Sequence, residues 1–131
     1  MASMIPLELN WTKLRAKCSA SAMFKNLQLG IENDIATFNS IPMRYPHEGF
    51  ASGLTSDGST FIVARRERIG PRVVFFIKGE KIEIRDEVTT KNYVASVTLN
   101  DEGRCKLKIE DREMELWQVR RLALESLFFG D

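Results

Sequence analysis

The sequence predicts an α+β fold in a single domain spanning residues 1–131, on three observations of hydrophobic spacing. Apolar residues recur with a helical period over 9–38, with a two-residue period from 50 to 110, and again with a helical period over 114–128. The first spacing is typical of a helix with one buried face, and the second of strands with one buried face. We therefore expect an N-terminal helical segment, an antiparallel meander of about six strands and a C-terminal helix packed on the sheet.

The N-terminal segment contains two apolar stripes at helical spacing. The first stripe follows Asn10, a plausible N-cap, and comprises Trp11, Leu14 and Cys18. The second comprises Phe24, Leu27, Ile31, Ile35 and Phe38. Either one long bent helix or two helices meeting near Ser19–Ser21 fits this pattern. Gly30 lies inside the second stripe, where a glycine costs ~1 kcal/mol relative to alanine, and it indicates a close packing contact or a break.

Turn residues divide the middle of the chain into strands. Asp57-Gly58 between two apolar runs is a strong hairpin signal, and Gly79-Glu80 is a plausible two-residue turn. Asn100–Gly103 marks a further turn. The expected strands are 50–55, 59–66, 72–78, 81–85, 93–99 and 105–109. Because the connections are short, we expect consecutive strands to pair antiparallel.

The last segment has the signals of a helix at both ends. Asp111 is a candidate N-cap, and Gly130 is a candidate C-terminal stop. Eight apolar residues between them give the helix a broad apolar face. We expect this helix over roughly residues 113–128, packed on one face of the sheet.

Composition limits the classes of partner. The chain has 19 basic and 18 acidic residues, so a net charge of +1 gives no general attraction to nucleic acid or anionic lipid. No stretch approaches the ~18 apolar residues of a membrane helix, and the first residues lack the pattern of a secretory signal. Cys18 and Cys105 could form one disulfide, but the core is large enough without it, so we expect two buried thiols. These features predict a cytoplasmic protein with no membrane partner.

Residues for catalysis or for binding metals and cofactors are few. His47 is the only histidine, and its neighbour Glu48 is poorly placed to orient it, because adjacent residues of an extended chain point to opposite sides. Paired metal-ligand spacings and phosphate-binding glycine motifs are absent from the sequence. Asp86-Glu87 is expected to be a solvated acidic turn. We expect no enzymatic activity, no cofactor and no metal.

Basic residues provide one hypothesis for binding. Arg65 and Arg66 lie in one expected strand, and Arg104, Lys106 and Lys108 line one side of a later strand. If these side chains converged, they would form a surface able to contact phosphates of a nucleic acid. Acidic residues are interleaved among them, so we take nucleic-acid binding as the alternative function.

Apolar residues near the C-terminus provide the favoured hypothesis, a protein-interaction or self-assembling module. Its candidate interface comprises Trp117, Leu127, Phe128 and Phe129. The uncharged strand 50–55 is a candidate edge for pairing, so a homodimer is somewhat favoured over a monomer. A further alternative is a carrier of a small apolar ligand, lined by core positions such as Phe61, Phe75 and Tyr93.

Overall fold

In the computed structural model, which describes residues 10–42, 49–66 and 70–130, seven strands form one antiparallel sheet. The strands pair in the order of the sequence, which confirms the predicted meander. Their bounds are β1 Phe50–Leu54, β2 Thr60–Arg65, β3 Val73–Lys78, β4 Lys81–Asp86, β5 Lys91–Leu99, β6 Cys105–Ile109 and β7 Arg112–Met114. The predicted turns at Asp57-Gly58 and Gly79-Glu80 both connect neighbouring strands.

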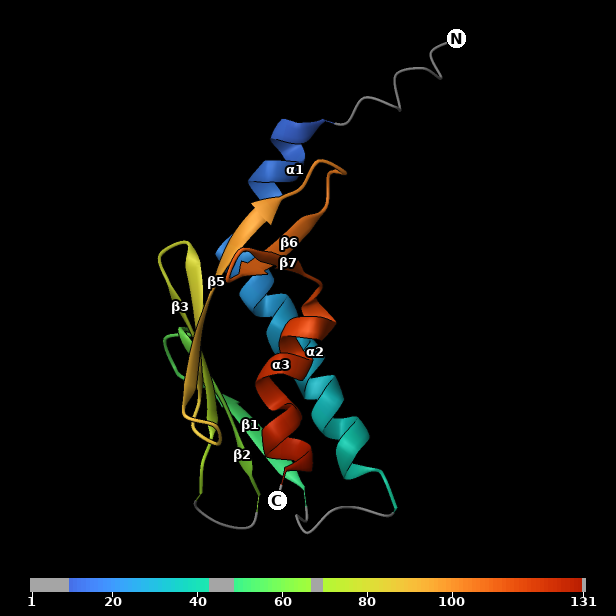
Figure 1. Cartoon of the computed structure of the whole chain (residues 1–131), viewed down its shortest axis with the longest axis vertical. Helices are drawn as coiled ribbons and strands as arrows, with labels where there is room; N and C mark the ends of the chain where they lie inside the picture. Colours follow the sequence, from blue (N-terminus) through green and yellow to red (C-terminus); the bar gives the residue numbers. More distant parts are fainter. Residues whose placement is uncertain (1–9, 43–48, 67–69, 131) are drawn as a thin grey trace.

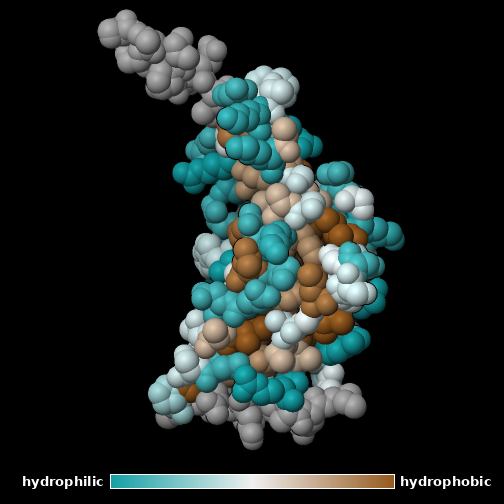
Figure 2. Space-filling model, turned by 180° about the vertical axis from the view of Figure 1, so that it is seen from behind, coloured by the Kyte–Doolittle hydropathy of each residue, from teal (hydrophilic) through white to brown (hydrophobic). Residues whose placement is uncertain are grey.

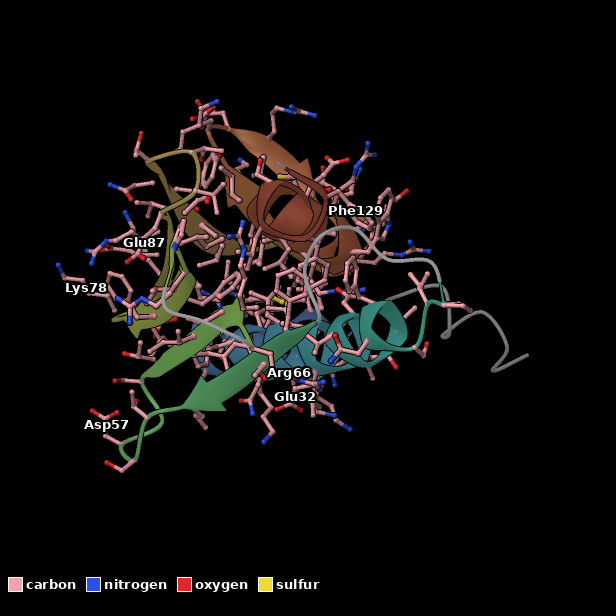
Figure 3. The ribbon with its side chains drawn as sticks, turned by 90° about the horizontal axis from the view of Figure 1, so that it is seen from below. Glu32, Asp57, Arg66, Lys78, Glu87 and Phe129 are labelled. Atoms are coloured by element: carbon pink, nitrogen blue, oxygen red, sulfur yellow. A yellow bond between two sulfur atoms is a disulfide. The ribbon has the colours of Figure 1, made fainter. Side chains whose placement is uncertain are left out.

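Two helices lie side by side on one face of the curved sheet, here called the inner face (Figures 1 and 3). They are α2, Ala20–Asn39, and α3, Leu116–Phe129. Both run in the same direction, down the molecule in Figure 1. The α+β fold with a C-terminal helix packed on the sheet is therefore confirmed.

The N-terminal segment consists of two helices rather than one bent helix. A short helix α1, Trp11–Lys17, begins at the predicted N-cap, where the Asn10 side chain accepts a hydrogen bond from the Lys13 amide. The helical conformation is interrupted at Cys18. The next helix, α2, begins after Ser19, whose hydroxyl accepts a hydrogen bond from the Ala22 amide. Figure 1 shows α1 at the upper end of α2, beyond the top of α3.

The core lies between α2, α3 and the inner face of the sheet. The predicted stripe of α2 is buried, and α3 contributes residues that are completely enclosed, such as Val119 and Leu127. The cross-strand row Phe61, Phe75 and Ile84 faces these helices, and each of the three is 1% exposed. Removing such surface from water at about 25 cal/mol per Å² is the main source of stability.

The seventh strand corrects the predicted start of the last helix. Glu110 and Asp111 have positive φ values of 51° and 64°, which makes them a tight two-residue turn between β6 and β7. Asp111 is therefore not the N-cap, and residues 112–114 are extended. The helix begins at Leu116, after Glu115, whose amide donates a 2.8 Å hydrogen bond to Oε1 of Gln118. It ends at Phe129 before Gly130, as predicted.

A disulfide joins Cys18 to Cys105, so the expectation of two free thiols is wrong. The bond connects the junction of α1 and α2 to the first residue of β6, 87 positions later in the sequence. Spacing alone did not reveal it, because the pairing depends on where the start of α2 meets the sheet. The inference of a cytoplasmic location loses part of its support, since disulfides persist mainly in oxidising compartments.

The side chain of Asn39 fixes the end of α2 against the start of β1. Its Nδ2 donates to the Phe50 carbonyl at 3.1 Å, and its Oδ1 accepts from the Phe50 amide at 3.0 Å. One amide side chain therefore takes the place of a neighbouring strand at this position of the sheet edge. Beside it, Gly49 has a φ of 136°, and a Cβ there would lie 2.6 Å from Asn39 Oδ1.

Reduction of the disulfide is expected to lower the free energy of unfolding by about 2–5 kcal/mol, because it releases a long closed loop in the unfolded chain. Urea denaturation with and without a reducing agent measures this difference. The Cys18→Ser/Cys105→Ser variant is the control, since its stability should not respond to the reducing agent. An unchanged midpoint for the native protein on full reduction would contradict the structural role of the bond.

Replacing Asn39 by alanine is expected to cost about 1–3 kcal/mol, because the amide and carbonyl of the mostly buried Phe50 lose their side-chain partner. Ser40→Ala, one residue further along and exposed, should change stability by less than about 0.5 kcal/mol. Thermal or urea unfolding of the two variants tests the difference. Equal effects would mean that the Asn39 bonds contribute nothing beyond the helix end.

Candidate functional site

A groove of about 390 Å³ lies between α2 and α3. Its lining from α2 and the residues just after it is Asp34, Thr37, Phe38 and Ile41. Its lining from α3 is Trp117, Arg120, Arg121, Leu124, Glu125, Phe128 and Phe129. The α2 set has the spacing i, i+3, i+4, i+7, so one stripe of that helix forms one wall.

The two ends of the groove have exposed aromatic side chains. Trp117, in the first turn of α3, is 54% exposed, and Phe129, at the last position of α3, is 48% exposed. These two positions are 12 residues apart, which corresponds to about 18 Å along a helix. Figure 3 shows Phe129 on the helix side of the molecule, away from Asp57 and Lys78 on the sheet side. Because Trp117 and Phe129 are about 18 Å apart along α3, the groove is long enough for several turns of a bound segment.

The floor of the groove is made of packed aromatic rings. Phe38 contacts Phe128 with ring centroids 5.3 Å apart and Phe129 at 5.5 Å. Phe128 also stacks on Phe50 of β1 at 4.5 Å. Because Phe38 and Phe128 are 3% and 6% exposed, they form a rigid base instead of a flexible patch.

The four predicted interface residues separate into two groups. Trp117 and Phe129 are exposed in the groove, whereas Leu127 is fully buried against the sheet and Phe128 belongs to the floor. The sequence did not separate the two groups, because the apolar face of α3 is too broad to show which of its residues contact the sheet. Thr37 and Ile41, which complete the site, were not predicted, because only the placement of α2 beside α3 brings them to the groove.

Arg120 crosses Gly30 to reach Asp34. A Cβ at Gly30 would lie 2.6 Å from Nη1 and 2.9 Å from Cζ of Arg120, so a side chain at this position would displace the guanidinium from its present place. Nε of Arg120 donates to Oδ2 of Asp34 at 2.7 Å. The contact confirms the predicted close packing at Gly30 and excludes a helix break there, since α2 continues through it. It also joins the two walls of the groove at this level.

The charged rim of the groove is neutral in sum. Arg120 pairs with Asp34, and Arg121 pairs with Glu125 at 3.4 Å on the same helix. The second pair is well exposed, so it contributes little to stability. With two cations and two carboxylates at the rim, the apolar lining dominates what the groove can bind.

The structure does not gather the five basic candidates into one patch. Arg65 and Arg66 are at the end of β2, while Arg104 precedes β6 and Lys106 and Lys108 lie within it. Three strands separate β2 from β6, which corresponds to roughly 19 Å measured along the sheet. Arg65 also faces inward, opposite Phe50, whereas the two lysines alternate with inward-facing Leu107 and therefore face outward.

Individual charges in this group are already engaged or enclosed. Lys106 is 8% exposed and forms an ion pair with Glu115, and this hydrogen bond lowers the pKa of the Glu115 carboxyl. Nε of Arg65 is buried and has no hydrogen-bond partner among the described residues. Arg66 and Arg104 are exposed. Lys108 is half-buried. The five side chains are therefore dispersed over separate places and do not form a continuous cationic surface.

The acidic pair Asp86-Glu87 serves structure. Asp86 is 2% exposed, and its carboxylate accepts from the amides of Val88 and Thr89 and from the Thr89 hydroxyl. Glu87 accepts two hydrogen bonds from the Arg72 guanidinium, which lowers its pKa. Within 10–42, 49–66 and 70–130, no three His, Cys, Asp or Glu side chains are arranged to hold a metal ion. His47 lies outside the described residues.

Comparison with known proteins adds no identification. No protein-family model, curated protein or solved structure matches the chain. None of the helices in the described part of the chain combines the length and apolar character needed to span a bilayer. The function must therefore be argued from the groove itself.

Gly30→Ala tests the contact that joins the two walls of the groove. Helix propensity alone predicts a gain of about 1 kcal/mol, but the new methyl group displaces Arg120 from Asp34 and offsets that gain. We expect no net stabilisation in the native background and a gain of about 1 kcal/mol when Arg120→Ala is already present. Urea unfolding of the four proteins of this cycle provides the measurement. The same effect of Gly30→Ala in both backgrounds would contradict the contact.

Proposed function

We propose that the protein is a non-enzymatic interaction module that binds an amphipathic helix of a protein partner in the groove between α2 and α3. The observation that carries this proposal is the pair of exposed aromatic residues, Trp117 and Phe129, at the two ends of a rigid apolar floor. Aromatic residues, and tryptophan above all, are enriched among the residues that supply most of the binding free energy of an interface.

The shape of the groove favours a helix as the bound segment. Its walls are two helices running in the same direction, and its length of about 18 Å accommodates some 12 helical residues. Helix-in-groove recognition uses apolar side chains at i, i+4 and i+7 as anchors. Such a stripe would lie along Trp117, Leu124 and Phe129, three lining residues from the first turn, the middle and the end of α3.

The neutral rim supports an apolar mode of binding. Because Asp34 and Glu125 are both paired with arginines, a charged ligand gains little from the rim. Burial of apolar surface then supplies most of the binding free energy, and this contribution changes little with salt. Salt dependence therefore distinguishes this mode from binding to phosphates, which weakens steeply as salt rises.

The alternative functions have less support. Nucleic-acid binding needs a continuous basic surface, and the five basic candidates are divided between β2 and β6. An apolar ligand carrier needs space at core positions such as Phe61 and Phe75, yet each is 1% exposed and packed against neighbouring core residues. The groove between the helices is the better-formed binding site.

A peptide titration tests the proposal. A labelled 15-residue helical peptide with leucine or phenylalanine at i, i+4 and i+7 should bind with little dependence on salt, as measured by fluorescence anisotropy. Trp117→Ala should weaken binding by about tenfold or more, the loss typical of an aromatic anchor.

Two controls make this experiment specific. Val94→Ala truncates an apolar residue that is 47% exposed on β5, outside the groove, and should leave the affinity unchanged. A scrambled peptide of the same composition should not bind. If a set of such peptides shows no binding that depends on Trp117, the proposed function is wrong.

A further inference from the structure

Helix α1 exposes apolar surface that the other described residues of the chain do not bury. No residue of α1, Trp11–Lys17, is buried, and Trp11 is 66% exposed, the largest exposed fraction among the large apolar side chains of the described residues. Leu14, one turn later on the same side of the helix, is partly exposed. Trp11 and Leu14 thus have the i, i+3 spacing of anchors for a helix-binding groove.

The same copy of the chain cannot place α1 in its own groove. The groove begins at Asp34, about 25 Å along α2 from Lys17. α1 lies at the opposite end of α2 and extends away from the body (Figure 1). The Cys18–Cys105 disulfide fixes the base of α1 at β6, so α1 cannot fold back toward the groove.

We infer that the groove between α2 and α3 binds α1 of a second copy, so that two chains exchange their N-terminal helices in a closed two-fold dimer. The inference rests on the proposed function, because it names the helix that occupies the proposed groove. At about 10 Å in length, α1 fits within the groove, with Trp11 between Trp117 and Phe129. Reciprocal exchange closes the assembly at two chains and leaves no free arm or groove to extend it.

The available apolar area favours two reciprocal contacts over one. Given the exposed fractions of Trp11, Trp117 and Phe129, and roughly 150–250 Å² for an aromatic side chain, one contact removes about 250–420 Å² of aromatic surface. Two contacts remove about 500–840 Å² before the flanking residues are included, against ~1,000 Å² for a specific interface. A single contact would fall well short of this limit.

The charge of α1 adds little to the affinity, because the rim of the groove is neutral in sum. Lys13, Arg15 and Lys17 make α1 cationic, with no acidic residue to balance them. At the groove, Glu125 has a side chain that is 57% exposed and only a 3.4 Å bond to Arg121, so its carboxylate can also accept a bond from an incoming lysine. Such an exposed pair sets orientation more than affinity.

Other surfaces of the molecule are weaker candidates for a dimer interface. Figure 2 shows hydrophobic surface interspersed with hydrophilic surface on the face seen from behind, mostly below the upper third of the molecule. The edge strand β1 exposes Ala51–Leu54, but the Asn39 side chain already occupies the backbone groups of Phe50. Pairing through β1 would be limited to the short remainder of that edge.

Light scattering of the full chain and three variants tests the inference. The native protein should approach twice the chain mass of 15.0 kDa at micromolar concentrations, and Val94→Ala should behave in the same way. Trp11→Ala and Trp117→Ala should each remain near 15.0 kDa. The first removes the aromatic side chain of α1 that enters the groove, and the second removes the aromatic side chain at one end of the groove. Circular dichroism should be unchanged in both, since both side chains are exposed.

Cross-linking locates the contact. A photoreactive benzoylphenylalanine at position 11 should join two chains and, after digestion, be attached to peptides of α3 or of residues 34–41. A native protein that stays monomeric, a dimer that survives Trp11→Ala, or cross-links to the sheet instead of the groove would each overturn the inference.

The peptide titration separates this inference from the proposed function. If helical peptides bind in a Trp117-dependent way to a protein that is monomeric, the groove accepts a helix but α1 is not its ligand. If the native protein dimerises through Trp11 and Trp117 and the peptides compete with dimerisation, both hold. If neither peptides nor α1 depend on Trp117, both fail.

Discussion

The contact among three phenylalanine rings determines how the helices sit on the sheet. Phe38 at the end of α2, Phe50 at the start of β1 and Phe128 near the end of α3 meet with centroid separations of 4.5 to 5.3 Å. Each ring comes from a different element, so their mutual packing fixes the lower ends of both helices against one edge of the sheet. The Asn39 bonds to Phe50 hold the same corner through the backbone. The groove exists because this corner keeps α2 and α3 in contact at their C-terminal ends.

Periodicity predicted most of the fold for physical reasons. A buried face repeats every 3.6 residues on a helix and every two on a strand. The stripe of α2 therefore predicted a helix, and the alternation in 50–110 predicted strands. Turns with Asp57-Gly58 and Gly79-Glu80 set the hairpins locally. The strand β7 was missed because three residues are too few to show a period. The disulfide was missed because Cys18 and Cys105 approach one another only through tertiary packing.

The candidate site was predicted in part. Trp117 and Phe129 were named from the apolar ending of the chain, but a wide apolar face does not tell which of its residues point to a sheet and which to solvent. Leu127 follows Ala123 by one turn, and both are buried. Phe129 lies outside this buried stripe and is exposed. The opposite wall, from Thr37 to Ile41, belongs to a helix more than 70 residues earlier. The basic residues failed to converge because sheet order places three strands between them.

The Cys18–Cys105 bond also divides the chain topologically. It closes a covalent ring that contains α2 and β1 to β5, and it leaves α1 on one side and the stretch from β6 to α3 on the other as two open tails. A protease that cuts the ring once leaves its halves joined, so the nicked molecule keeps its mass until it is reduced. Cleavage in the segment between Cys105 and α3 instead leaves no covalent link to α3. One wall of the groove is thus retained by a covalent loop, while the other depends entirely on packing.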